Sequence, residues 1–396
     1  MKAIIRCFVL IILVASAKWA FSQPSKIIRS EKEYQVTLDL IRSSWEFLDV
    51  YIDSIWPDWK NYKETPVFVG APKYFDLFVN PYKPVPPGFV KLPYKLCNTD
   101  VFYRDSSHLS DSYCGLSLKI DDLYFRLARI EPYSEEMSSK FLSYVQKRFE
   151  KNNSTLPGLE KHFYSYDNWM KTLIHESFHL YQLKRKPISS LTFPANFTRP
   201  SHIVMSFLEG QLLLKALETE SDEELKEIVN DFITVRNRRY RRSIFWKENS
   251  DNEFEWIEGG ATYIDYKVLT YLRKYELKLG GILPDNKQRS EIDLTTYYKI
   301  RLDIDSRYFN KYWGKDYHYG LAMILVLDRI CGNDWKEEIL KRNTSLFGLL
   351  KKYNGYAVDR ENARFKRIKN NYGYSFVLKQ VKRFKKDGFI PIDYDY

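Results

Sequence analysis

The chain has 396 residues, of which 44% are hydrophobic and 29% are charged, and its formal net charge at pH 7 is +11. This length can bury a large core, as one elaborate domain or two closely packed ones. The excess of positive charge is spread along the chain without a nucleic-acid-binding motif, so we expect no nucleic-acid partner.

The N-terminus has the pattern of a secretory signal peptide. Lys2 and Arg6 precede an apolar run over residues 7–15, and a cleavage site follows at residues 20–22. The apolar run is too short to span a bilayer, and no later stretch reaches about 18 uncharged apolar residues. We therefore expect residues 1–22 to be removed, and the mature protein to be exported to the periplasm, cell surface or medium without a transmembrane segment.

The region 23–157 predicts a mixed α and β structure. Apolar residues at helical spacing predict a long helix over residues 30–55, and short apolar runs predict strands at residues 67–69, 74–79 and 123–128. Residues 80–93 contain five prolines, which favours a loop or an edge strand over a central strand. A further helix is expected at residues 135–151, followed by a surface loop at residues 152–157 that is the best candidate for a domain boundary.

Three cysteines remain after the predicted signal peptide, namely Cys97, Cys114 and Cys331. Export permits disulfides, and Cys97 and Cys114 flank a turn that could bring them together. The sequence leaves this pairing open, because it does not give the Cα distance that a disulfide needs. No Cys-x-x-Cys pair is present, so a thiolate zinc site is not indicated.

The region 158–396 is predicted to be almost entirely helical, which gives an α+β fold that is predominantly α. The predicted helices lie at residues 201–217, 221–242, 253–275, 317–330, 333–341 and 345–353. Residues 360–386 are basic and aromatic and predict two surface helices that end in a basic tail. The aromatic side chains of this tail should dock on the core and its charges should face water, although contact with an anionic partner is an alternative.

One segment carries the pattern of a metal site. His175-Glu176-Ser-Phe-His179 lies in a stretch with apolar residues at helical spacing, with Asp167 as a candidate N-cap and Pro187 as the stop. In a helix, residues four apart lie on the same face, so both imidazoles could bind one metal ion. Glu176 beside them could take a proton from water at the metal, as in zinc peptidases.

A third ligand has to come from elsewhere in the chain. No histidine follows at the spacing of the three-histidine zinc peptidases, which favours a carboxylate from a second helix. Glu258 precedes Gly259 and Gly260, whose cost to helix stability would be explained by close backbone approach to a metal or substrate. Glu209 is the alternative ligand, or else a buried partner of a ligand histidine or of an arginine.

These segments together resemble the gluzincin metallopeptidases. The likeness rests on His175-Glu176-x-x-His179 and on Trp-x-Glu258-Gly-x-Ala-x-Tyr263, and covers only short segments between residues 167 and 330. Tyr317-His-Tyr-Gly320 is similar to the Tyr-x-x-Gly segment of aminopeptidase-like members. The interval between His179 and Glu258 is much longer than in those enzymes, so the predicted helices between them would be an insertion.

The resemblance implies an exported zinc-dependent hydrolase, and specifically a peptidase with a zincin-like pair of active-site helices. It makes His175, His179 and Glu258 the zinc ligands, and Glu176 the general base. Tyr317 would donate a hydrogen bond to the oxyanion, with His318 or Tyr319 as substitutes for it. A substrate carboxylate could be held by the arginines at 238, 239, 241 and 242, although Asp and Glu partners for them are the alternative. A non-catalytic binding protein on the same scaffold and a structural helical protein with a chance motif are the competing hypotheses.

Overall fold

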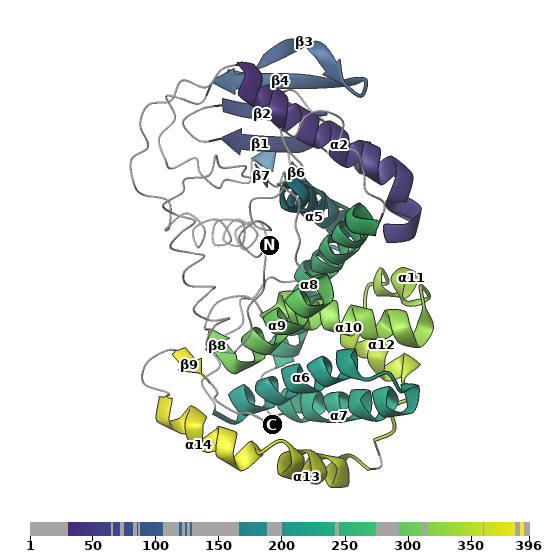
Figure 1. The fold of residues 1–396 in the computed structure, drawn as a ribbon, viewed down its shortest axis with the longest axis vertical. Coiled ribbons are helices and arrows are strands. Elements are labelled where there is room, and N and C mark those ends of the chain that lie inside the picture. Colours follow the sequence, from purple (N-terminus) through teal and green to yellow (C-terminus); the bar gives the residue numbers. More distant parts are fainter. Residues whose placement is uncertain are drawn as a thin grey trace. The chain divides into compact units, whose positions relative to one another are not determined.

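The predicted class of fold is confirmed in a computed structural model of the chain, which is mostly helical with a small, largely antiparallel sheet near the N-terminus (Figure 1). The structure describes residues 31–64, 66–71, 75–81, 85, 88–105, 119–120, 123–124, 127–128, 166–187, 200–241, 245–274, 293–310, 315–358, 360–384 and 389–391. The predicted signal peptide, the predicted helix at 135–151 and the predicted boundary at residue 157 lie outside these residues. None of the described helices is long and apolar enough to cross a bilayer.

The chain forms two compact units, and each of them consists of two separate stretches of sequence. The first comprises Met1–Lys184 together with Ile264–Ile292, while the second comprises Arg185–Tyr263 and Asp293–Tyr396. Helix α8 (Phe245–Lys274) begins in the second unit and ends in the first.

The first unit contains a five-stranded sheet with the strand order β3-β4-β2-β1-β7. The strands are β1 (Val67–Ala71), β2 (Phe75–Val79), β3 (Val90–Leu96), β4 (Thr99–Asp105) and β7 (Leu127–Ala128), with β7 parallel to β1 and the other neighbours antiparallel. A separate short hairpin joins β5 (Lys119–Ile120) to β6 (Leu123–Tyr124). Phe68 and Phe78 form the buried centre of the sheet.

Pro93, the last of the five prolines at residues 80–93, has the predicted effect on the sheet. Strand β3 contains Pro93 and pairs only with β4, so it lies at the sheet edge, where a missing N–H costs no ladder bond. The register of the β3–β4 pair shifts between Lys91 and Lys95, on either side of this proline. Within residues 123–128, where one strand was predicted, the structure describes the short strands β6 and β7.

Helix α2 (Glu31–Ile55) is the predicted long N-terminal helix. Its apolar stripe is buried, as Leu38, Ile41, Trp45 and Leu48 are each at most 4% exposed. Pro57 follows its last turn, and a short 3₁₀ helix, η1 (Tyr62–Glu64), leads into β1. Burial of this stripe, at about 25 cal/mol per Å² of apolar surface, is the main source of the helix's stability.

The second unit is helical. Its helices are α6 (Pro200–Glu218), α7 (Asp222–Arg241), the first part of α8, α9 (Leu294–Arg307), α10 (Lys315–Cys331), α11 (Trp335–Ile339), α12 (Leu346–Tyr353), α13 (Glu361–Asn371) and α14 (Tyr374–Phe384). A short antiparallel pair joins β8 (Tyr308–Asn310) to β9 (Phe389–Pro391). Helices α6, α7 and α10 supply most of its core, and the two predicted C-terminal helices, α13 and α14, are confirmed.

Candidate metal centre

The helix that carries the motif is α5 (Tyr166–Arg185). It begins one residue before the predicted N-cap Asp167, which therefore lies in the first turn and is 3% exposed. A carboxylate in the first turn interacts favourably with the helix dipole. The helix ends at Arg185, two residues before Pro187, as the sequence predicts.

Helix α5 is fixed within the first unit by an aromatic cluster. The rings of Trp56 and Trp59 meet the ring of Phe178 edge-on, at centroid distances of 5.2 and 5.1 Å. Trp56 Nε1 donates a hydrogen bond of 3.1 Å to the hydroxyl of Tyr181. Aromatic pairs of this kind add about 0.5–1.5 kcal/mol each beyond the area they bury. Phe178 precedes His179 and Tyr181 follows it, so this packing sets the rotation of the motif about the helix axis.

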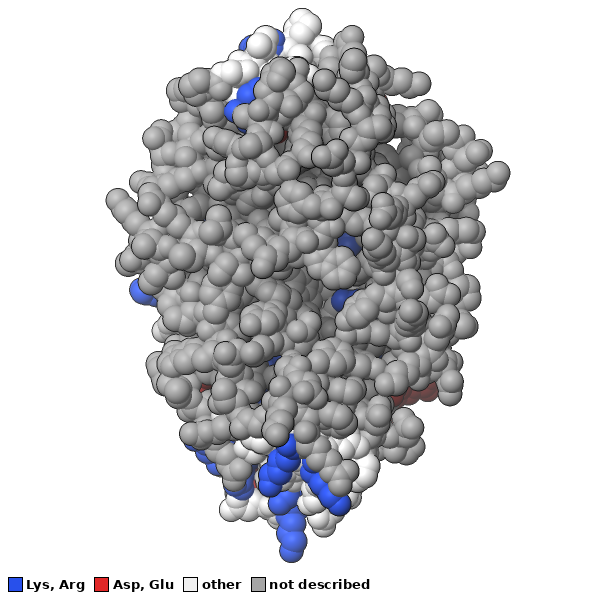
Figure 2. Space-filling model, turned by 90° about the vertical axis from the view of Figure 1, so that its left-hand side faces the viewer, with Lys and Arg blue, Asp and Glu red and all other residues white. Residues whose placement is uncertain are grey.

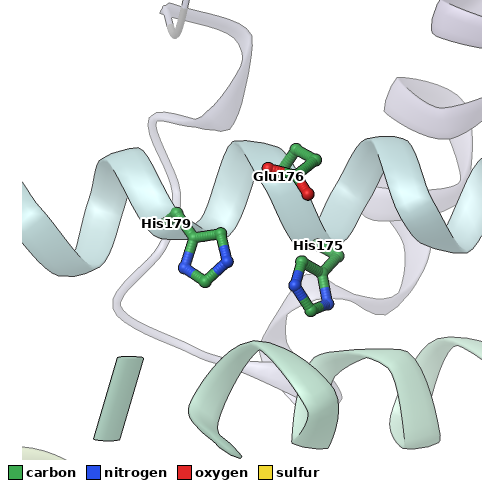
Figure 3. A group of neighbouring side chains, drawn as sticks. All are labelled: His175, Glu176 and His179. Carbon is green, nitrogen blue, oxygen red and sulfur yellow. The ribbon is translucent and has the colours of Figure 1, made fainter. Parts of the chain in front are cut away.

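His175, Glu176 and His179 form a group that could hold a metal ion. One ligand atom from each residue lies within 4.8 Å of those of the other two. Figure 3 shows the two imidazole rings on the same side of α5, with Glu176 beside His175. The ring centroids are 4.8 Å apart, and the histidines are 8% and 1% exposed, while Glu176 is partly exposed. Among the residues that the structure describes, no other group of three or more His, Cys, Asp or Glu side chains lies close enough together to share an ion.

The ring of His175 is oriented by a carboxylate from α8. Its Nδ1 lies 3.0 Å from Oδ2 of Asp265, which is 8% exposed at the side chain. The ammonium of Lys171, one turn before His175 on α5, lies 3.5 Å from the same oxygen. Because a carboxylate can only accept, Nδ1 of His175 is the donor, and the neutral ring then has its lone pair on Nε2.

The ring of His179 is oriented by an amide on its own helix. Nδ1 of His179 lies 3.0 Å from Oε1 of Gln182, a residue that is fully buried. An amide oxygen also accepts only, so His179 takes the same tautomer as His175. Histidines that bind metals characteristically donate their second ring N–H in this way, which fixes both the tautomer and the ring plane.

This arrangement fits a divalent metal ion of the zinc type. Two neutral imidazoles and a carboxylate are nitrogen and oxygen donors that zinc accepts, although other transition metals accept them as well. Asp265 and Gln182 were not predicted to have a role. Asp265 lies in the segment already noted for Glu258, but nothing in the sequence pairs it with a histidine 90 residues earlier.

Glu258 lies in α8 in the second unit and is 1% exposed. It is seven residues before Asp265 in the sequence of α8. Its assignment as a metal ligand stays a prediction.

Helix packing within the second unit explains why a glycine follows Glu258. A Cβ on Gly259 would lie 2.4 Å from the Cα of Gly320 in α10, and a Cβ on Gly320 would lie 2.3 Å from the carbonyl oxygen of Glu255. The backbones of α8 and α10 therefore cross in contact at these two glycines. The close backbone approach that the sequence predicted for Gly259 is made to another helix.

Glu209 has arginine partners, one of the alternatives that the sequence left open. Arg239 Nη2 donates to its carboxylate at 2.9 Å, and Arg236 Nε does so at 3.0 Å. All three side chains are fully buried. Burial raises the pKa of Glu209, but the guanidiniums of Arg239 and Arg236 outweigh it and hold this pKa below its usual range.

The arginine pairs extend to α8. Arg236 also donates to Glu255 at 2.8 Å, and Arg239 to Asp251 at 2.5 Å. Outside the core, Arg238 and Arg241 both pair with Glu361. The predicted Asp and Glu partners of the α7 arginines are therefore present, while Arg242 lies outside the described residues.

The predicted oxyanion donors all lie in the first turns of α10. Tyr317 is partly exposed and His318 is 7% exposed. Tyr319 is fully buried, and its hydroxyl donates a hydrogen bond of 2.7 Å to the carbonyl of Ser206 in α6. Tyr319 therefore packs α10 against α6, a role that the Tyr317-His-Tyr-Gly320 segment did not indicate.

Two further predictions concern the cysteines. Cys97 has an exposed free thiol in the β3–β4 turn, while its predicted partner Cys114 lies outside the described residues. Cys331 is the last residue of α10 and is partly exposed.

Comparison of the chain with protein-family models, with curated proteins and with solved structures finds no match.

Proposed function

We propose that the protein is an exported zinc-dependent hydrolase, and within that class a peptidase of the gluzincin type. The observation that carries the proposal is the convergence of His175, Glu176 and His179 on α5, with ligand atoms within 4.8 Å of one another. The acceptors at Nδ1 of both histidines support it, because they prepare both rings to offer Nε2.

The proposed roles follow from the chemistry of these side chains. His175 and His179 would hold the ion, and zinc at this position would polarise the scissile carbonyl and lower the pKa of water. Glu176 would take the proton from the attacking water and return it to the leaving amine. Asp265 and Gln182 would keep the rings in place through both proton transfers.

Two further residues complete the proposal. Glu258 is the proposed third ligand, supported by its likeness to the Glu-Gly-x-Ala-x-Tyr segment and by its place seven residues before Asp265 on α8. Tyr317 is the proposed hydrogen-bond donor to the oxyanion, because it is more exposed than His318 and Tyr319. The proposed substrate is a peptide or a protein.

The test compares hydrolysis by two glutamate variants of the mature chain from Gln23 onward. Peptide mixtures are incubated with the wild type, with Glu176→Gln and with Glu46→Gln, an exposed control on α2, and the products are identified by mass spectrometry. Wild type and control should cleave equally, and Glu176→Gln should lose about 10²–10⁴-fold in rate while it keeps its zinc.

The other outcomes separate the competing hypotheses. Zinc bound to a wild type that cleaves no peptide would favour the non-catalytic binding protein. Unchanged cleavage by Glu176→Gln would remove Glu176 as general base.

A further inference from the structure

Helices α13 and α14 present a surface on which the described exposed charges are all positive. The segment 360–384 contains a single acidic residue, Glu361. This residue is only 4% exposed and accepts a hydrogen bond of 2.7 Å from Arg241 of α7. The carboxylate of Glu361 is therefore paired with an arginine of the second unit and does not neutralise the exposed positive charges of α13 and α14.

Two arginines of α13 also point toward helix α7 of the same unit. Arg364 lies 3.3 Å from Glu227 and 3.5 Å from Asp231, both on α7. Arg367 donates to Asp231 at 2.5 Å. These guanidiniums fasten α13 to α7, so their charges are already balanced by protein carboxylates.

The lysines of these two helices are exposed, and the ammonium of Lys369 also lies 5.1 Å from the ring centroid of Tyr374. Lys366, Lys369, Lys379 and Lys382 are all exposed, and within the part of the chain that the structure describes none forms an ion pair. Figure 2 shows Lys and Arg side chains projecting together at the lower end of the view, where α13 and α14 lie in Figure 1.

An exposed aromatic ring lies on the same helix as two of these lysines, Lys379 and Lys382. Phe376 is 53% exposed and precedes Lys379 by about one turn of α14. The opposite side of α14 is packed, since Tyr374, Val377 and Val381 are at most 8% exposed. Helix α14 is therefore held firmly by its apolar side while it presents Phe376 and the two lysines outward.

We propose that the lysine face, formed by Lys366, Lys369, Phe376, Lys379 and Lys382, docks on an anionic phospholipid surface. Ammonium groups near such a surface attract phosphate headgroups strongly enough to raise affinity about fivefold each. An aromatic ring beside them can enter the boundary between headgroups and acyl chains. The inference does not depend on the proposed hydrolase activity.

The composition of the face favours lipid over nucleic acid. Nucleic-acid surfaces combine arginine forks with several aromatic rings on which successive bases stack. Here Arg364 and Arg367 are engaged by carboxylates, and Phe376 is the large apolar side chain exposed on the described part of α14. Several lysines with a single exposed aromatic ring suit a surface of phospholipid headgroups better than the stacked bases of a nucleic acid.

The test is sedimentation of the mature chain from Gln23 onward with phospholipid vesicles. This form is used because the predicted signal peptide would itself enter lipid. Vesicles of phosphatidylcholine alone are compared with vesicles that contain phosphatidylglycerol in equal part, at low and at high salt. A quadruple variant carries Gln at Lys366, Lys369, Lys379 and Lys382. The matched control carries Gln at four other exposed lysines, Lys60, Lys95, Lys226 and Lys341.

The proposal expects wild type and control to bind the phosphatidylglycerol vesicles, and to release them at high salt. The quadruple variant should bind at least about a hundredfold more weakly. Phe376→Ser should weaken binding further than Val358→Ser, which removes another exposed apolar side chain. Far-ultraviolet circular dichroism of all variants checks that each is folded.

Three results would overturn the proposal. They are equal binding by the quadruple variant and its control, equal binding to both kinds of vesicle, and tighter binding to a DNA duplex than to the anionic vesicles. The last result would assign the face to a nucleic acid.

Discussion

The two histidines of α5 differ in the acceptor that orients each ring. His175 donates to the carboxylate of Asp265, whereas His179 donates to the neutral amide of Gln182. A charged acceptor holds a ring N–H more strongly than a neutral amide does, so the ring of His175 is the more firmly oriented of the two. Lys171 pairs with the same oxygen of Asp265 and holds this carboxylate in place.

Replacement of Asp265 by Asn should weaken zinc binding about 10–100-fold, because His175 loses its charged acceptor. Competition with a chromophoric chelator measures the zinc dissociation constant. The matched control is Asp53→Asn on the exposed side of α2, which should leave the constant unchanged. An unaltered constant for Asp265→Asn would show that the carboxylate has no part in metal binding.

A second residue gives a prediction for pH. Burial raises the pKa of Asp316 to about 7; Asp251 and Glu255 act in the same direction and Lys315 opposes them. A raised pKa means that the folded protein favours the protonated carboxyl. The contribution of the protonated Asp316 carboxyl to the free energy of unfolding is therefore complete below about pH 4 and is lost as the pH rises through about 7.

The variant Asp316→Asn should remove this loss. At pH 8 it should be more stable than the wild type, by on the order of 2 kcal/mol, and the advantage should shrink toward pH 5. Urea unfolding at several pH values measures the difference, with the exposed Asp58→Asn as the control. A stability difference that does not change with pH would contradict the assignment.

At the residue scale the sequence predicted the side chains of the metal group but not their acceptors. His175, Glu176 and His179 follow from a local spacing on one helix. Asp265 could not be predicted, because its contact with His175 depends on tertiary packing across 90 residues. The role of Gln182 was within reach of local reasoning, since it lies three residues after His179, on the adjacent turn of α5.

At the scale of elements, the contact between α8 and α10 depends on two glycines. Gly259 and Gly320 let the two backbones touch, next to the segment that contains Glu258. Any Cβ at either position would have to push the helices apart, because the atoms it meets belong to a backbone.

Gly259→Ala should therefore destabilise the protein by about 1–3 kcal/mol, although alanine favours a helix. Gly348→Ala on α12 is the control, because the nearest atom there is the flexible hydroxyl of Ser345 at 3.2 Å. This control should change stability by less than about 1 kcal/mol. Denaturant unfolding of both variants measures the effect, and a stable Gly259→Ala protein would contradict the tight crossing.

Helices with a strong helical periodicity of apolar residues were predicted well, whereas elements without a clear periodicity were not. Helices α2, α6, α7 and α10 lie within a few residues of their predicted ranges, because each carries an apolar stripe. Helix α7 begins directly after Ser221, whose Oγ accepts a hydrogen bond from the N–H of Glu224. The carboxylate of Glu224 accepts from Thr219, so only half of a capping box forms.

Strand β4 and helix α9 were not predicted, and for residues 80–93 the sequence left open a loop or an edge strand. The choice between the two depends on the pairing of β3 with β4, which local sequence does not reveal. Helix α9 begins after a polar stretch and has a weak apolar stripe, so its stability depends on packing against α6 and α10.

At the scale of the whole molecule, the motif helix and the proposed third ligand belong to different units. Helix α5 lies in the first unit with Asp265, and Glu258 lies in the second unit on the same helix as Asp265. A discontinuous unit of this kind cannot be predicted from local sequence, because Ile264–Ile292 joins it by tertiary contacts alone.

The central claim is that α5 carries a zinc site, and metal analysis of the dialysed protein at neutral pH tests it most directly. The wild type and the control His202→Ala, which removes a buried histidine of α6, should each retain about one zinc ion per chain. The double variant His175→Ala/His179→Ala should retain none while it stays folded. A wild type without zinc, or equal zinc in the double variant, would contradict the account.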